Sequence, residues 1–365
     1  MKKSLIALAV MAAAGAACAQ SSVQLYGLAD VWFGSAKSEA TGEKSVSNTA
    51  VESGGLNTSR WGAKGSEDLG GGLKANFKLE QGFSLDTGSA QDKSKAFNRQ
   101  SWVGVSGGFG EVQVGKLWTS YDDVRSAAND TFSANISASN RTWLGYSDRT
   151  DNGLKYISPS YNGFSGSLTL ALGEDKKTDA DKSNNASSVT SLGLHYANGP
   201  LVVGFSHQQQ QQNGAGGVFS ALPGVGAGQV ASLLPTGIIE GGKTTYNLLN
   251  GSYNFGVAKL VGGINQVKQS LDVGPFDSGK AREFNLGVEV PLAANLNLGA
   301  GYASSKVELD GQDSFKTTGY TAALLYSLCK RTSVYGALTQ AKLQSEVSTV
   351  EVKSTIYAVG VNHKF

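Results

Sequence analysis

The sequence predicts an all-β protein, a 16-stranded antiparallel transmembrane β-barrel. Three observations support this fold class. Apolar and polar residues alternate along many short segments, short and long connections alternate along the chain, and glycine is abundant (48) while proline is rare (6). Alternation with a period of two is typical of strands that have one apolar and one polar face. Abundant glycine suits the tight turns that many strands need.

The N-terminus has the layout of a secretory signal. In "MKKSLIALAVMAAAGAACAQ", two lysines precede an apolar run and an A-x-A cleavage site that ends at Ala19. We therefore expect a signal peptide over residues 1–19 and a single domain over 20–365. An N-terminal core helix is the alternative. A lipid anchor on Cys18 is disfavoured, because Gly15 occupies a position where a large aliphatic residue is expected.

Export limits what the mature chain can be. Loss of Lys2 and Lys3 leaves 29 basic residues (31 minus 2) against 29 acidic residues, so no basic excess points to a nucleic-acid partner. One cysteine, Cys329, remains, and a lone thiol cannot form an internal disulfide. Beyond the signal, no apolar run reaches the 18 residues of a membrane helix. An exported chain that enters a membrane must then do so as a closed barrel.

Strands are predicted wherever the two faces separate cleanly. Residues 73–80, "LKANFKLE", place four apolar side chains on one face and four polar side chains on the other. The segments 164–172, 283–290 and 295–302 show the same pattern. A soluble antiparallel sandwich also alternates. The polar faces here are small and hydrophilic, however, which favours a water-filled lumen.

The connections between these strands set their number. Seven connections are short, such as "SEDLGGG", "SGGFGE" and "YANGP". Eight are long and are centred near residues 33–56, 83–97, 117–150, 173–188, 208–243, 267–281, 304–315 and 341–352. With both termini on the short-turn side, this order gives sixteen strands, short periplasmic turns and long external loops. The glutamine run at 208–212 is expected to lie in one of the long loops.

Several segments together are similar to the general porins of β-proteobacteria, the neisserial type included. They are "QSSVQLYGLADVWF", "NTSRWGAKGSEDLGGGLKANFKLEQGF", "FNRQSWVGVSGGFGEVQVGKL", "YDDV", "NGLKYISPSYNGFSG" and the ending "VGVNHKF". The resemblance covers residues 20–365 and is strongest in the strands and short turns. It implies a homotrimeric barrel in the Gram-negative outer membrane that passes small hydrophilic solutes and ions, with a third external loop folded into the lumen.

The same resemblance implies an arginine cluster on the barrel wall at the constriction. Arg60 and Arg99 lie in matching motifs, and Arg149 matches less closely, with Arg141 as its competitor. Side chains alternate between the two faces of a strand, and this alternation supports a lumen position for Arg60, which shares a face with Lys64. It also supports a lumen position for Arg99, if Trp102 on the opposite face of its strand faces lipid. Lumen-facing parity adds two further wall candidates, Lys74 and Lys78. The alternative is that all five are ordinary lumen or rim charges.

The segment 118–148 is expected to be the constriction loop. A connection this long is usually functional, and it carries three acids, Asp122, Asp123 and Asp130. Folded inward, these carboxylates would face the basic wall and create a transverse field. More bases than acids predicts a mild preference for anions. A solvated external loop is the alternative, and the loop lacks the "PEFG"-like stretch of neisserial relatives.

Other functions are disfavoured by the sequence. The three histidines, His195, His207 and His363, form no triad with a serine and an acid, so an outer-membrane enzyme lacks a general base. No metal or other cofactor is expected. A substrate-specific channel for sugars or organic acids is the main alternative, and an adhesin or structural barrel a weaker one.

The last strand is expected to close the barrel. Tyr357 and Phe365 lie on its apolar face, eight residues apart, and it should pair with the strand that begins "VQLYG". Its terminal phenylalanine resembles the signal by which the barrel assembly machinery recognises outer-membrane proteins. The expected partners are therefore two further copies of the chain, outer-membrane lipid or lipopolysaccharide, and this machinery.

Overall fold

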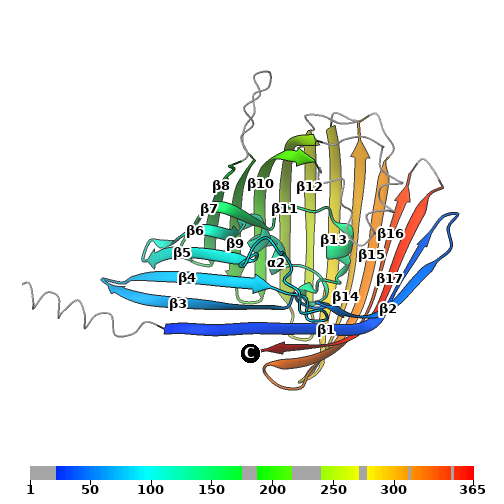
Figure 1. Cartoon of the computed structure of the whole chain (residues 1–365), viewed down its shortest axis with the longest axis horizontal. Coiled ribbons are helices and arrows are strands. Elements are labelled where there is room, and N and C mark those ends of the chain that lie inside the picture. Colours follow the sequence, from blue (N-terminus) through cyan, green and yellow to red (C-terminus); the bar gives the residue numbers. More distant parts are fainter. Residues whose placement is uncertain (1–21, 175–186, 216–239, 271–277, 311–313, 347–348) are drawn as a thin grey trace, which may run out of the picture.

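The computed structural model describes residues 22–174, 187–215, 240–270, 278–310, 314–346 and 349–365. The expected signal peptide, residues 1–19, lies outside this part. One antiparallel sheet curves around a lumen (Figure 1). Its strands are β1 (Ser22–Ala40), β2 (Val46–Ser53), β3 (Arg60–Gly70), β4 (Leu73–Gly82), β5 (Gln100–Gly107), β6 (Gly110–Trp118), β7 (Arg149–Ile157), β8 (Phe164–Leu172), β9 (Ser188–Asn198), β10 (Leu201–Ala215), β11 (Glu240–Asn254), β12 (Lys259–Ser270), β13 (Ser278–Ala293), β14 (Leu296–Leu309), β15 (Phe315–Ser327), β16 (Thr332–Ser345) and β17 (Glu351–Lys364).

These 17 segments form 16 barrel strands, because β2 and β3 are two parts of one strand. β1 pairs with β3 through its first part, from Ser22 to Leu28. It pairs with β2 through its second part, from Val31 to Ser38. Between β2 and β3, residues 54–59 leave the sheet, and we call this segment the insert. The prediction of a sixteen-stranded antiparallel barrel is therefore confirmed.

The barrel closes between its first and last strands. β1 and β17 are antiparallel over a continuous register from Leu28 opposite Lys364 to Ala40 opposite Val352. Beyond it, Gly27 and Phe365 exchange two backbone hydrogen bonds, of 2.9 and 3.0 Å. A Cβ on Gly27 would lie 2.2 Å from the Phe365 ring, so a glycine is required for this ring to pack across the seam.

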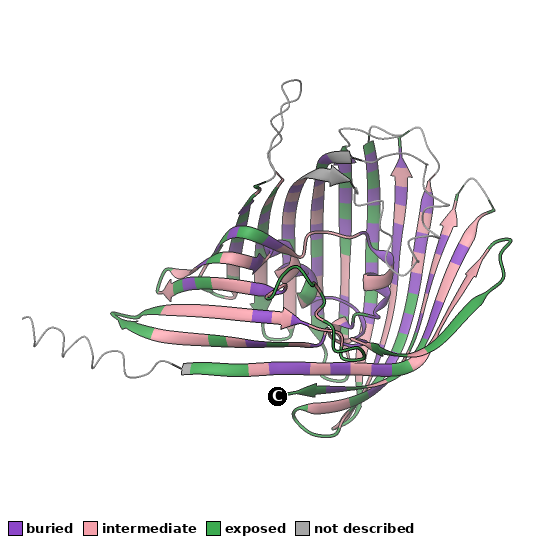
Figure 2. Cartoon of the chain, in the orientation of Figure 1, coloured by how far each residue is buried: buried purple, intermediate pink, exposed green. Residues whose placement is uncertain are grey.

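The two faces of the sheet differ as the alternation predicts. On β13, Phe284 and Leu286 are exposed on the outside, whereas Glu283 and Asn285 are buried inside. The same banding follows most of the tall strands in Figure 2. Aromatic rings lie in contact along the outer surface, including Phe284 with Tyr302 and Tyr302 with Tyr320, as in the aromatic girdle of membrane barrels.

Parts of two of the expected long loops are in fact strand. The segment 33–56 contains the end of β1 and the whole of β2, and the turn between them covers only residues 41–45. The glutamine run at 208–212 lies in β10, so its placement in a loop was wrong. Above the membrane both faces of a strand contact water, so the hydropathy alternation fades while the hydrogen-bond ladder continues.

No helix in the described part of the chain is both long and apolar enough to cross a membrane. Among the residues that the structure describes, three helical segments are present, and all lie in the third long connection, residues 119–148, which we call loop 3. They are α2 (Ser120–Ala127), η1 (Thr131–Ser133) and α3 (Ala138–Thr142). Figure 1 shows α2 inside the curve of the sheet. Loop 3 therefore folds into the lumen.

Candidate functional site: the constriction formed by loop 3

Loop 3 is first attached to the wall formed by β8 to β11. The Thr119 side chain accepts a hydrogen bond from the Asp122 amide and so caps the N-terminus of α2. The Tyr121 amide donates to Ser191 of β9 at 2.8 Å. Asn250 of β11 donates to the Val124 carbonyl at 2.7 Å. These contacts from lumen-facing polar side chains hold α2 against the wall.

The second half of loop 3 crosses to the opposite wall. The hydroxyls of Thr321 and Thr339, on β15 and β16, both donate to the Ile136 carbonyl, at 3.1 and 2.6 Å. A Cβ on Gly319 of β15 would lie 2.5 Å from the Thr142 side chain. Glycine on the inner face of the barrel therefore lets α3 approach the wall closely.

The insert provides a third attachment for loop 3. Asp30, fully buried, accepts hydrogen bonds from the Gly55 and Asn57 amides at 2.8 and 3.1 Å and from Tyr335 at 2.8 Å. The insert in turn accepts from loop 3, because the Asn135 amide donates to the Leu56 carbonyl at 3.0 Å. The interruption of the second barrel strand thus brings backbone into the lumen to meet the loop.

A basic group lies on the wall formed by β3, β4 and the start of β5. Glu80 is its only acid among the described contacts. Arg99 Nε lies 2.7 Å from Glu80, Arg60 Nε lies 3.7 Å away and Lys78 Nζ lies 3.8 Å away. Three bases around one carboxylate leave this group of four side chains with a net charge of +2.

The parity argument for Arg99 was wrong, although its lumen position is observed. Trp102 pairs with lumen-facing Lys78, whereas Val103 is 60% exposed on the outside, so Trp102 faces the lumen as well. Arg99 precedes β5, where regular alternation no longer applies. Its guanidinium can therefore turn inward to Glu80.

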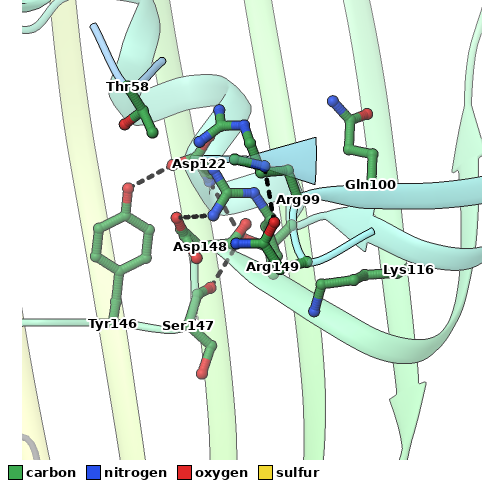
Figure 3. Close-up of polar contacts among 12 residues, drawn as sticks. Thr58, Arg99, Gln100, Lys116, Asp122, Tyr146, Ser147, Asp148 and Arg149 are labelled. Atoms are coloured by element: carbon green, nitrogen blue, oxygen red, sulfur yellow. Dashed lines mark hydrogen bonds and ion pairs between the residues drawn. The ribbon is translucent and has the colours of Figure 1, made fainter. Parts of the chain in front are cut away.

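Arg149 lies near Arg99 at the point where loop 3 rejoins the barrel (Figure 3). Its guanidinium is 3.6 Å from the centroid of the Trp118 ring, and that of Arg99 is 5.5 Å from the same centroid. Arg149 Nη1 also pairs with Asp148 at 2.9 Å. The register shifts in this region, between Gly115 and Leu117, so a simple parity count does not reach residue 149.

Loop 3 contributes a base that the sequence analysis missed. Arg125, 7% exposed, lies over the rings of Tyr146 at 4.6 Å and Trp143 at 5.3 Å. It also donates to Asn140 at 3.4 Å. Contacts between a guanidinium and aromatic faces are favourable when partly desolvated. Its position in the last turn of α2 offered no distinctive sequence signal.

These groups surround one cavity of about 410 Å³ between loop 3 and the wall, which we call the arginine cavity. Its charged lining consists of four arginines and two aspartates: Arg60, Arg99, Arg125, Arg149, Asp122 and Asp148. Four positive charges against two negative charges give it a net +2 when both acids are ionised. Arg141, the competitor of Arg149, is absent from the lining.

The three predicted loop acids lie in different places. Asp122 lines the arginine cavity and accepts from the Tyr146 hydroxyl (Figure 3). Asp123 pairs instead with Lys155 on β7. Asp130 is fully buried and accepts from the Ala138 and Ser139 amides at 3.1 and 2.9 Å. Asp130 therefore organises the start of α3 and does not face the arginine cavity.

The two predicted wall lysines lie outside the lining of the arginine cavity. Lys78 pairs with Glu80, and Glu80 in turn pairs with two arginines of the lining, Arg60 and Arg99. Lys74 is at the beginning of β4, beside the short turn, and is exposed. Among the described residues, no group of three or more His, Cys, Asp or Glu could hold a metal ion.

Known proteins are similar to this chain over most of its length. The family model described as "Gram-negative porin" matches residues 5–345. Outer membrane porin protein 32 of Delftia acidovorans is 32% identical, over 99% of this chain and 95% of that protein. An outer membrane porin protein of Bordetella pertussis is 30% identical over the whole of both chains.

Solved structures share the fold. The anion-selective porin from Comamonas acidovorans superposes with a TM-score of 0.72 at 28% identity, over 95% of this chain and 100% of that chain. A trimer form of OmpT from Vibrio cholerae superposes with a TM-score of 0.66 at 18% identity, over 94% and 99% of the two chains. At that identity, the second likeness concerns the fold alone.

Proposed function

Since this chain belongs to the Gram-negative porin family, we propose that it is an outer-membrane diffusion pore with a mild preference for small anions. Membership of this family makes the chain a porin of the Gram-negative outer membrane through which solutes diffuse. Members of the family are non-enzymatic channels, and the prediction that the chain is no enzyme is confirmed. The preference for anions is the proposed part.

The charge of the arginine cavity carries the proposal. Four arginines and two aspartates line it, and fixed charges in a narrow aqueous passage favour ions of the opposite sign. Arg60 and Arg99 belong to a group of three bases whose shared acidic partner, Glu80, cannot neutralise all of them. The anion selectivity named for the Comamonas porin agrees with this sign.

A reversal-potential measurement tests the proposed selectivity. The purified protein in a planar bilayer, placed in a potassium chloride gradient, should give a reversal potential that favours chloride over potassium. A potential that favours potassium would reject the anion preference and leave the assignment as a porin unaffected.

A substrate-specific channel is the second candidate. Three aromatic side chains, Trp118, Trp143 and Tyr146, line the same cavity as the arginines, and aromatic surface with fixed charge could select one planar anionic solute. Swelling of liposomes with solutes of graded size separates the two candidates. A steep size limit without chemical preference supports the general pore, whereas flux that saturates with one solute supports the specific channel.

Homotrimeric assembly is also a proposal. It is supported by the resemblance to general porins and by the membership of this chain in the Gram-negative porin family. Cross-linking of the protein in its native membrane, followed by electrophoresis without heating, should give a product of three chains. A product of one chain under these conditions would reject it.

A further inference from the structure

Trp118 is the last residue of β6 before loop 3, and Arg149 is the first residue of β7 after it. The two residues are directly opposed in the register of the sheet. The Thr119 amide donates to the Asp148 carbonyl at 2.9 Å and continues this pairing into the loop. The Trp118 carbonyl accepts from the buried ammonium group of Lys155 at 3.0 Å. The backbone of Trp118 is therefore fixed, and its ring lines the arginine cavity.

The Trp118 ring contacts two of the four arginines in this cavity. The guanidinium carbon of Arg149 lies 3.6 Å from the ring centroid, and that of Arg99 lies 5.5 Å away. Both distances are within the limit of about 6 Å at which the face of an aromatic ring attracts a cation. Two positive groups that share one ring repel each other, and water screens this repulsion only weakly when the groups are partly buried. The ring therefore holds together two bases that would otherwise separate.

The acids beside these two arginines hold them unequally. Buried Glu80 pairs with Arg99 at 2.7 Å. Asp148 pairs with Arg149 at 2.9 Å, but its side chain is 44% exposed, and an ion pair with an exposed partner contributes little to holding a side chain. Arg149 Nε is buried and has no hydrogen-bond partner among the described residues. The Trp118 ring is therefore the main support of the Arg149 guanidinium.

A second arginine of the cavity, Arg125 on loop 3, is held by aromatic rings in the same way. Its guanidinium lies 4.6 Å from the centroid of Tyr146 and 5.3 Å from that of Trp143. Within the described part of the chain it forms no ion pair. Tyr146 is itself supported by the ring of Tyr121, at 4.8 Å between centroids. Aromatic rings can thus hold an arginine in this cavity with no acid paired to it.

We propose that Trp118 is a positioning residue for the selectivity of the pore, whose ring holds Arg149 and Arg99 in the passage without neutralising them. A carboxylate in its place would hold the guanidinium groups but would subtract a charge from the cavity. An aliphatic side chain would leave the charge unchanged but would let the guanidinium groups move apart. An aromatic face avoids both losses, because its attraction for a cation comes from the ring quadrupole and adds no net charge. This role of Trp118 rests on the proposed anion preference of the pore.

Substitutions of Trp118 separate the position of the arginines from their charge, because they leave the charged lining of the cavity unchanged. Each contact between a guanidinium and a ring at a partly exposed site is worth a factor of about 2 to 5 in the population of the held orientation. In Trp118→Leu the permeability ratio of chloride to potassium should therefore fall about twofold. Trp118→Phe keeps an aromatic face and should stay closer to the wild-type ratio. The measurement is the reversal potential in a potassium chloride gradient at pH 8.5.

The matched control is Trp61→Leu, since Trp61 is 43% exposed on the outer face of β3 and its loss should leave the permeability ratio unchanged. Trp118→Met replaces Trp118→Leu if the latter folds poorly, because methionine adapts to irregular space, and it should show the same loss. The role of Trp118 is overturned by a wild-type ratio in Trp118→Leu or Trp118→Met. It is also overturned by an equal loss in Trp118→Phe, or by an equal loss in the control.

A crystal structure of Trp118→Leu gives a readout that does not depend on selectivity. The Arg149 guanidinium should leave its place in the cavity or adopt more than one conformation. Unchanged positions of Arg99 and Arg149 would overturn the role of Trp118, whatever the selectivity of the pore. A wild-type pore without a preference for chloride would instead reject the proposed function, and the structure of the variant would still show whether the ring holds the arginines.

Discussion

The hydroxyl of Tyr146 donates a hydrogen bond to Oδ1 of Asp122, with 2.5 Å between the two oxygens, at the edge of the arginine cavity. Burial raises the pKa of Asp122 to about 7, against the hydrogen bond from Tyr146, and the neighbouring carboxylates of Asp148 and Asp123 raise it as well. Arg125 opposes this shift. One of the two acids in the cavity therefore changes charge close to neutral pH.

The selectivity of the pore should accordingly depend on pH. Below pH 7 Asp122 is neutral and the cavity carries more net positive charge, so the preference for anions should be larger at pH 5.5 than at pH 8.5. The measurement is the reversal potential at both values, and Asp122→Asn should show the same strong anion preference at each. A pH effect of the wild-type size in Asp122→Asn would assign the titration to another group.

The same pKa fixes the sign of an effect on stability. A carboxyl whose pKa is higher in the folded state than in the unfolded state favours the folded state only while it is protonated. Stability from this source is present below the unfolded value near 4 and is lost as the pH rises through about 7. Asp122→Asn should remove that loss of stability. Thermal unfolding in detergent at pH 5.5 and pH 8.5 measures it in the variant and in the wild type.

Removal of Glu80 should make the wall more positive. Glu80→Gln leaves Arg60, Arg99 and Lys78 without a counter-charge, so the chloride preference should increase. It should also cost about 2–3 kcal/mol of folding free energy, less than for a fully buried pair, because two of the bases are partly solvated. Reversal potentials and thermal unfolding test the two effects separately. A decrease in chloride preference would contradict the assigned role of this wall.

The glutamine run should hold the end of loop 3 in place. Gln208 donates to the Ser147 carbonyl and Gln210 accepts from the Ser147 amide, both at 3.1 Å. Gln208→Ala/Gln210→Ala should release this end of the loop and increase open-channel noise and conductance. The matched control is Gln209→Ala/Gln211→Ala, since these side chains lie on the other face of β10. Equal open-channel noise in the two double variants would show that Gln208 and Gln210 do not hold the end of loop 3 in place.

The terminal residue should matter for assembly more than for conduction. Deletion of Phe365 removes both hydrogen bonds to Gly27 and the ring that packs on it. The amount of folded protein in the outer membrane should fall severalfold, while the channels that do form should keep wild-type conductance. Tyr357, opposite Ser35 within the continuous register, should tolerate substitution by Phe. Wild-type amounts of the deletion variant would exclude the terminal assembly signal.

The sequence was informative where one physical rule governs each residue. In the membrane, alternation identified both faces of strands such as β4 and β13, and connection lengths gave the sixteen strands and the place of the third long loop near 118–148. The inward path of that loop was implied by the resemblance to general porins. Beyond the apolar surface that faces the membrane, the outer face of the strands becomes polar. The extensions of β1, β2, β10 and β11 could therefore not be distinguished from loops.

The site was predictable only in part, for reasons that single residues illustrate. Arg60 follows from parity, because β3 is regular there. Arg99 and Arg149 lie at strand ends, where irregular backbone decides the direction of the side chain. Asp130 and Arg125 depend on the folded path of loop 3, which no periodic pattern encodes: one is an acceptor for buried amides and the other a base on aromatic rings.

The most direct test of the account is the reversal potential of the triple variant Arg60→Ala/Arg99→Ala/Arg149→Ala at pH 8.5. It leaves Arg125 as the one arginine against two aspartates in the cavity, and changes the net charge from +2 to −1. The matched control Lys37→Gln/Lys342→Gln/Lys353→Gln, which replaces three outward-facing lysines, should give the same reversal potential as the wild type. We predict that the potential changes sign and favours potassium, with a larger conductance. An unchanged preference for chloride would contradict the central role of this cavity.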